Sequence, residues 1–207
     1  MGNYKYYIVH CTATPFHMDV TKGHIQMWHM APKDVYDQNG KPTGEVIYME
    51  KTYKSRNDLP DEYINGMSIK KLVGNGWTRT GYERLIMRCG SDVVMHEVDY
   101  DDIISYAEMT WGALGVNHES KHVCLVGGHT QDGKKVGLFD FMEIYNTAMY
   151  LKLQQLIKHE VARHPHVLVG GHNQFNQKTC PNFDMENFCR LIGIPEQNIL
   201  KTKPFNY

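Results

Sequence analysis

The sequence predicts a single α/β domain with a central mixed β-sheet of about five or more strands and helices on both faces. Three observations support this fold class. Short apolar runs rich in β-branched and aromatic residues alternate with stretches of helical periodicity. The 207 residues are enough for one well-buried domain and few for two. Hydrophobic residues make up 42% and charged residues 22%, as in ordinary globular proteins.

The first elements follow from local patterns. Residues 4–11 are rich in β-branched and aromatic side chains, which predicts a strand with His10 near its C-terminal end. Thr21 has the side chain of a helix N-cap, and Ile25 follows at the spacing of an inward-facing helical residue. We therefore expect a short helix after the first strand.

The middle of the chain contains a polar region and then a hairpin. Residues from about 31 to 75 carry many turn-forming residues, which predicts an inserted loop region with a short hairpin at 45–53. Residues 85–88 and 93–98 are apolar runs separated by a Gly-Ser pair. This arrangement predicts two antiparallel strands joined by a turn.

The remaining elements complete the alternation of strands and helices. Residues 122–126 form an apolar strand that ends in two glycines. A capping-box pattern at Asp140 predicts one long helix that ends before Pro165. Residues 166–169 then predict a strand, and Asp184 can cap a last helix.

Charge and hydropathy exclude some classes of partner. The formal net charge is −1, so no global field attracts the chain to nucleic acid or to anionic lipid. No apolar run approaches the length of a membrane helix, and the first residues lack a signal-peptide core. We therefore expect neither a nucleic-acid nor a membrane partner, and we expect the chain to fold in a cytoplasm.

The five cysteines do not indicate a disulfide framework in such a compartment. Cys11, Cys89, Cys124 and Cys189 have apolar neighbours and are interpreted as small buried hydrophobic residues. Cys180 differs, because polar and basic residues surround it.

Three residues are candidate metal ligands: His10 at the end of the first strand, His172 after the last strand, and Cys180 eight residues later. Imidazole and thiolate are ligands that zinc prefers, and three protein ligands with one open position are typical of a catalytic zinc site. The spacing by itself is also compatible with packed or surface histidines, since the chain has no paired C-x-x-C ligands.

Five motifs in order give the sequence a family resemblance. Together they resemble the type 2 N-acetylmuramoyl-L-alanine amidases, a family that includes coliphage lysozyme-like enzymes and shares its fold with the animal peptidoglycan recognition proteins. The motifs are IVHCTAT (8–14), QMWH (26–29), GWTRTGY (76–82), NHES with VCLVGG (117–120 and 123–128), and GHNQFNQKTCPNFD (171–184).

The resemblance implies one Zn²⁺ per chain, held by His10, His172 and Cys180 in a cleft at one edge of the sheet. It implies catalytic roles for Tyr82, whose hydroxyl can orient water or donate to an oxyanion, and for Lys178, whose ammonium can stabilise developing charge. The implied reaction is hydrolysis of the bond between N-acetylmuramic acid and L-alanine in bacterial peptidoglycan. A phage endolysin of this kind waits in the host cytoplasm and reaches the wall after holin-type release.

Several alternatives stay open. Tyr82 could be an ordinary sheet residue and Lys178 a solvated loop charge. The chain could bind peptidoglycan without cutting it, or regulate a phage RNA polymerase as a lysozyme-like protein. The same ligands would also accept cobalt or nickel in vitro. Two departures from the family pattern are Glu83, where the family usually has histidine, and the segment 110–113, which lacks a histidine often found there.

Overall fold

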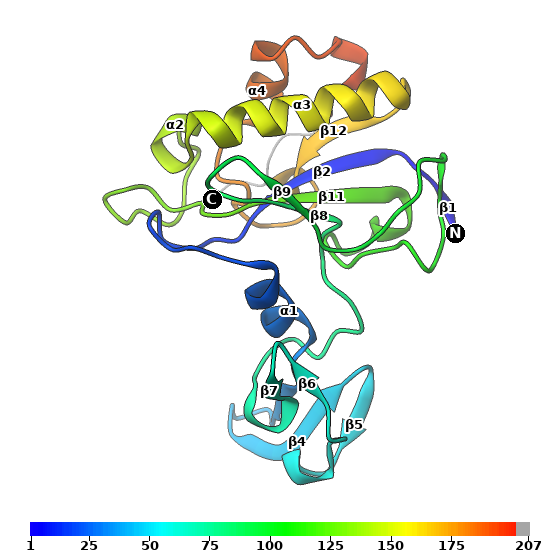
Figure 1. The fold of residues 1–207 in the computed structure, drawn as a ribbon, viewed down its shortest axis with the longest axis vertical. Coiled ribbons are helices and arrows are strands. Elements are labelled where there is room, and N and C mark those ends of the chain that lie inside the picture. Colours follow the sequence, from blue (N-terminus) through cyan, green and yellow to red (C-terminus); the bar gives the residue numbers. More distant parts are fainter. Residues whose placement is uncertain (202–207) are drawn as a thin grey trace. The chain divides into compact units, whose positions relative to one another are not determined.

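The structure is a computed structural model that describes residues 1–201, and these residues form two compact units (Figure 1). The first unit combines residues 1–20 with the chain from residue 81 onward, and the second comprises residues 21–80. Residues 31–75, expected as an insertion, lie within the second unit. Whether both units act as one catalytic domain over 1–207 stays a prediction.

The first unit is built on a five-stranded mixed sheet (Figure 1). Its strand order is β12-β2-β11-β8-β9. The strands are β2 (Tyr6–Cys11), β8 (Arg84–Ile86), β9 (Asp92–Val94), β11 (Ser120–Leu125) and β12 (Leu168–Gly171). The expected mixed sheet and the expected hairpin between the fourth and fifth strands in this order are confirmed.

Strand β2 lies at the centre of the parallel part of this sheet. Strand β11 pairs with it in parallel, with Ile8 opposite His122 and His10 opposite Cys124. Strand β12 pairs with its other edge, also in parallel. Residues 7 to 11 of β2 are all buried, as expected for a parallel strand covered on both faces. The VHCTAT and VCLVGG motifs therefore form two adjacent strands.

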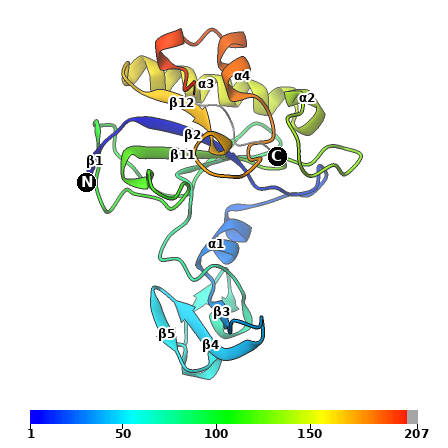
Figure 2. The ribbon, with the colours of Figure 1, turned by 180° about the vertical axis from the view of Figure 1, so that it is seen from behind.

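Helices flank the sheet (Figures 1 and 2). Helix α3 (Thr147–Arg163) packs on β8, and α4 (Met185–Leu191) packs on β12. Asp184 caps α4 by accepting the backbone N–H of Asn187, and Gly193 ends the turn at a φ of +79°. The predicted fold class, a mixed sheet flanked by helices, is confirmed.

The structure has two helices where the sequence predicts one long helix. The chain forms α2 (Phe141–Ile144), breaks at Tyr145 and resumes as α3. Asn146 explains the break, because its extended backbone and its side chain form a new N-cap that accepts the N–H of Met149. The amide of Asn146 also donates to the carbonyl of Arg88 at 2.9 Å, which fixes this cap against the β8–β9 turn.

The second unit has its own small core. The polar composition predicted mainly loops, yet Val46, Tyr48, Leu59 and Ile69 form a buried cluster. The expected hairpin is present as β4 and β5, and a third strand extends it. The elements of this unit are α1 (Lys22–Met30), β3 (Lys33–Tyr36), β4 (Pro42–Tyr48), β5 (Lys51–Tyr53), η1 (Arg56–Asp58), β6 (Tyr63–Ile64), β7 (Met67–Ser68) and η2 (Ile69–Lys71). Met49, Tyr53 and Ile64 pack against this cluster, so apolar residues spread along a polar segment form a core of its own.

The remaining elements are short. Strands β1 and β10 pair antiparallel, and single 3₁₀ turns connect the longer elements. They are β1 (Gly2–Asn3), β10 (Ile103–Ile104), η3 (Asn117–Glu119), η4 (His172–Gln174) and η5 (Glu196–Asn198). Within residues 1–201, none of the helices has the length and apolar character needed to cross a membrane.

Candidate metal centre

His10 lies near the C-terminal end of β2, an interior strand of the sheet, and is buried. The β-branched and aromatic residues before it favour the extended backbone, and ladders on both edges fix that backbone. Its Nδ1 faces the Sγ of Cys180 at 4.0 Å, and its Nε2 lies 3.0 Å from Nδ1 of His122. The two ring nitrogens of His10 therefore have different partners.

His172 opens the turn η4 directly after the edge strand β12. A side chain at Gly171 would lie 2.8 Å from Pro181, so the absence of one lets the chain after Cys180 approach the strand. The Nε2 of His172 lies 2.9 Å from Oδ1 of Asn176, which accepts from it when that nitrogen is protonated. Nδ1 is then the atom of His172 that can bind a metal.

Cys180 is carried by a loop that backbone and side-chain hydrogen bonds anchor. Its Sγ accepts the backbone N–H of Cys11 at 3.1 Å, and its carbonyl accepts the N–H of Asn173 at 2.7 Å. The next carbonyl, of Pro181, accepts the hydroxyl of the buried Tyr145 at 2.9 Å. The thiol is thus held against the end of β2 on a rigid support.

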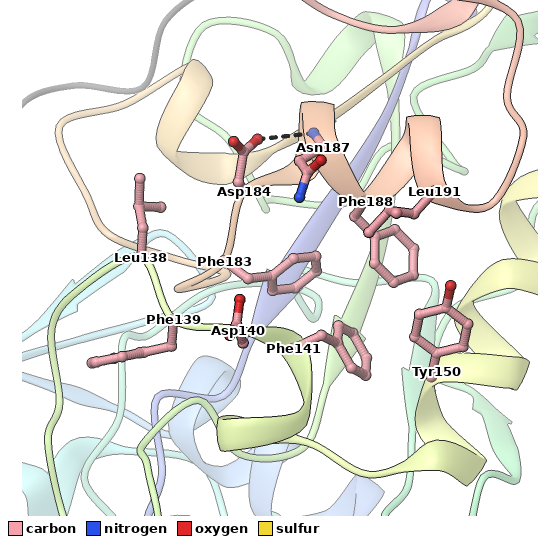
Figure 3. A pocket seen from close by; sticks show the side chains of 10 residues that line it. All are labelled: Leu138, Phe139, Asp140, Phe141, Tyr150, Phe183, Asp184, Asn187, Phe188 and Leu191. Atoms are coloured by element: carbon pink, nitrogen blue, oxygen red, sulfur yellow. Dashed lines mark hydrogen bonds between the residues drawn. The ribbon is translucent and has the colours of Figure 1, made fainter.

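An aromatic cluster packs around Phe183, which lies shortly after Cys180 in the chain (Figure 3). Phe183 follows the loop and packs edge-on to Phe141 at a ring-centroid distance of 5.0 Å. Phe188 stacks on Phe141 at 5.2 Å, and Tyr150 closes the group. These rings line a shallow pocket beside α2 and α4 whose lining includes none of the three candidate ligands. The cluster therefore stabilises the loop and does not extend the candidate centre.

The three candidate ligands converge. One ligand atom each from His10, His172 and Cys180 lies within 4.8 Å of the others. Two imidazoles and one thiolate, buried or half-buried, are a donor set that suits zinc and leaves a fourth position open. The residues present therefore fit a metal ion, and the cluster could hold one.

Electrostatics favour the metal-binding form of His172. Burial, assisted by the charge of Lys178, lowers the pKa of His172 to about 4. The imidazole is therefore neutral at neutral pH, which leaves a lone pair for a metal. Burial raises the pKa of the Cys180 thiol, whereas coordination deprotonates a thiol outright. Burial therefore disfavours the thiolate form of Cys180, and a cation bound at this position would offset that penalty.

Tyr82 lies beside the candidate ligands. Its ring centroid is 5.1 Å from that of His10. Burial, with the neighbouring thiols of Cys124 and Cys180, raises its pKa well above the usual value. The hydroxyl therefore keeps its proton over the physiological pH range and can donate a hydrogen bond.

Lys178 is exposed and lies on the loop between His172 and Cys180. Its charge acts on His172, as the lowered pKa of that histidine indicates. The structure thus places His10, His172, Lys178 and Cys180 at the ends of β2 and β12 or on the loop that follows β12, and it brings Tyr82 beside His10 from the segment before β8. Their roles in binding and catalysis stay predictions.

The chain is similar in sequence to known endolysins and in structure to known amidases. No family model matches the chain. The endolysin of Escherichia phage T7 is 29% identical over 113 residues, which are 55% of this chain and 66%, just under two thirds, of that protein. The endolysin of Enterobacteria phage K11 is 23% identical over 185 residues, covering 89% of this chain and 84% of that protein.

Two solved structures superpose over most of the chain. The Ph2119 endolysin from Thermus scotoductus MAT2119 bacteriophage Ph2119 gives a TM-score of 0.52 at 15% identity, covering 94% of this chain and 88% of that one. The N-acetylmuramoyl-L-alanine amidase LysC from Clostridium intestinale URNW gives 0.53 at 14% identity, covering 93% and 87%. The chain has the amidase fold. The family resemblance carried by the sequence motifs is confirmed.

On this amidase fold, sequence reasoning missed His122 and the interactions of Glu83. His122 is buried and lies on the strand next to His10. Glu83 is buried as well, and its carboxylate accepts the hydroxyl of Thr110 at 2.9 Å and the backbone N–H of His122. Strands of a buried parallel sheet are usually apolar throughout. A histidine inside the run KHVCLV was therefore the signal in the sequence that His122 has a role other than packing.

The burial of the cysteine side chains confirms the prediction for three of them and contradicts it for one. Cys11, Cys124 and Cys189 are buried, as predicted. Cys89 is exposed, which contradicts its interpretation as a core residue. The reason is its place in the turn between β8 and β9, where its thiol contacts the hydroxyl of Ser91 at 3.0 Å.

We expect the Glu83 carboxyl to make this amidase fold less stable as pH rises. Burial raises the pKa of Glu83 from 4.5 to about 8, so the folded chain keeps a proton that the unfolded chain releases near pH 4.5. The stabilisation is fully present below pH 4.5 and is lost as pH rises through about 8. Relative to Glu83→Gln, the free energy of unfolding of the wild type should therefore fall across this window.

Urea unfolding of the two proteins with chelator present, at several pH values between 4.5 and 8, measures this difference. The lowered pKa values of His29, His122 and His172 make the free energy of unfolding rise with pH. Both proteins contain these histidines, so their effect cancels when the free energy of Glu83→Gln is subtracted from that of the wild type. A difference that does not change with pH would show that the carboxyl titrates as it does in the unfolded chain.

Proposed function

We propose that the chain is a zinc-dependent N-acetylmuramoyl-L-alanine amidase that hydrolyses the amide between N-acetylmuramic acid and L-alanine in bacterial peptidoglycan, and that it acts as a phage endolysin. The observation that carries the proposal is the convergence of His10, His172 and Cys180 within 4.8 Å at one end of the sheet of an amidase fold. The endolysins among the similar sequences support the phage assignment.

In this proposal His10, His172 and Cys180 hold one zinc ion, which supplies Lewis-acid chemistry for attack of water on the amide. The neutral imidazole of His172 and the anchored loop of Cys180 present their donor atoms without rearrangement. Pre-formed ligands of this kind reduce the reorganisation that catalysis requires.

Tyr82 and Lys178 supply the remaining polar groups. The protonated hydroxyl of Tyr82, beside His10, can donate to the oxygen of the amide as negative charge develops on it. The exposed ammonium of Lys178 can stabilise the same charge or bind an acidic group of the peptide stem. A hydrogen bond or charge directed at the developing oxyanion is stronger in the transition state than in the ground state, which is the condition for acceleration.

Delivery to the wall belongs to the same proposal. The chain waits in the host cytoplasm and meets peptidoglycan after holin-type release. An RNA polymerase partner stays a prediction that no contact in the structure addresses.

The test is the release of peptide stems from purified peptidoglycan. Amide cleavage should create free N-terminal alanine with no new reducing sugar ends, a pattern that separates an amidase from a glycosidase. We expect a strong chelator to abolish the release and added zinc to restore it. Binding to the wall with bound zinc but no release of peptide stems would contradict the proposal and favour a peptidoglycan-binding protein.

A further inference from the structure

Strand β11 places a second histidine behind the candidate metal centre. His122 and Ile8 are in register on adjacent parallel strands, and Ile8 and His10 are two residues apart on β2. Since side chains alternate along a strand, His10 and His122 share one face of the sheet. The Nε2 of His10 and the Nδ1 of His122 lie 3.0 Å apart, and both side chains are buried.

The position of the His122 ring is fixed from several directions. The backbone of His122 belongs to the β11 ladder, and its N–H also donates to the carboxylate of Glu83. Gly112 lies against the ring, because a Cβ at this residue would be 2.6 Å from Cγ and Nδ1 of His122. The ring therefore has little freedom to move away from His10.

The cost of burying His122 argues against a purely structural role. Within the described residues, its Nε2 is buried and has no hydrogen-bond partner. A buried polar atom without a partner costs roughly 1–3 kcal/mol, whereas an apolar side chain could fill the same space without that cost. In the part of the chain that the structure describes, the hydrogen-bond partner of this ring is His10.

The two nitrogens of His10 determine what that interaction does. Nδ1 faces Cys180, so it is the atom that can coordinate a metal. A neutral imidazole that coordinates through Nδ1 carries its proton on Nε2. Nδ1 of His122 lies where it can accept this proton, as Asn176 can for His172. Acceptors of this kind set the tautomer and orientation of metal-binding histidines.

We propose that His122 is a positioning residue of the metal centre: it accepts the Nε2–H of His10 and holds Nδ1 of His10 toward His172 and Cys180. This inference rests on the proposed zinc site. It also connects two departures from the family pattern, since Glu83 holds the strand of His122 and the glycine in segment 110–113 admits its ring.

The experiment compares zinc affinity, measured by competition with a chelating dye, in wild type, His122→Phe and His122→Asn. Phenylalanine keeps a ring but cannot accept, and should weaken zinc binding by about 10–100-fold. Asparagine offers a carbonyl oxygen close to the position of Nδ1 and should restore most of the affinity. Val123→Ala is the matched control, because it truncates a buried residue of the same strand and should leave zinc affinity unchanged.

A second measurement detects the hydrogen bond between His10 and His122. Imidazole ¹⁵N NMR of the zinc-loaded protein should show a slowly exchanging Nε2–H on His10 in wild type and His122→Asn, and a rapidly exchanging one in His122→Phe. If His122→Phe does not fold, His122→Ala replaces it, because the smaller side chain removes the acceptor without overpacking.

The outcomes separate the two proposals. Wild-type affinity for zinc in His122→Phe or His122→Ala would overturn the positioning role while leaving the zinc site intact. Failure of the wild type itself to bind zinc would overturn the proposed function. The same weakening in Val123→Ala would show that zinc affinity reports only on stability, and would also overturn the positioning role.

Discussion

Cys180→Ser should lose zinc and with it the release of peptide stems. Serine keeps the size of the side chain but replaces a thiolate by a weakly acidic hydroxyl, which is not among the ligands that zinc prefers. Lewis-acid stabilisation by a metal contributes several kcal/mol, so activity should fall by about a thousandfold or more. The measurements are the zinc content of the purified protein and the rate at which peptide stems are released.

Cys89→Ser is the matched control for this substitution. It makes the same chemical change at an exposed turn of the same unit, where the thiol contacts the hydroxyl of Ser91. Zinc content and rate should stay at the wild-type level. Full activity of Cys180→Ser with one zinc per chain would show that the metal is held elsewhere.

Tyr82→Phe should give the second large effect, with a different signature. The substitution removes one hydroxyl beside His10 and leaves the three proposed ligands in place. Loss of one donor to a developing oxyanion costs about 10²–10³-fold in kcat. Zinc affinity should not change, so the variant would bind metal normally and turn over slowly.

Tyr4→Phe controls for the loss of a buried tyrosine hydroxyl. Tyr4 donates to Glu160 at 3.0 Å and precedes β2, so it lies about 20 Å from His10 along the extended strand. This variant should lose stability and keep its kcat once folded. A Tyr82→Phe enzyme with wild-type kcat would place Tyr82 among the ordinary residues of the sheet.

Local sequence was sufficient for most elements of the first unit and for the start of α1 in the second. The strands around His10, Val123 and Val169 were recognisable because β-branched residues favour extended backbone whatever surrounds them. Caps at Thr21 and Asp184 were recognisable because a side-chain oxygen satisfies nearby N–H groups within one turn. Such interactions span three residues, so a single sequence contains all their information.

The departures between expectation and structure have long-range causes. The break between α2 and α3 depends on Asn146, whose cap is strengthened by the carbonyl of Arg88, 58 residues away in the chain. The second unit folds because four apolar residues spread over positions 46 to 69 meet in one core. Neither contact leaves a periodic pattern in the chain.

For the candidate site, the sequence by itself determined the residue types, which are two imidazoles at the ends of predicted strands and a thiolate eight residues after the second, and the motifs that carry the family resemblance. Only the tertiary structure decided which nitrogen of His10 faces Cys180 and which faces His122. That distinction depends on the parallel register of β2 and β11, on the hydrogen bond from the His122 backbone to Glu83, and on the packing of the His122 ring against Gly112. The register arises from pairing between segments more than a hundred residues apart, and the ring orientation arises from contacts that form only in the folded chain, so no local preference encodes either.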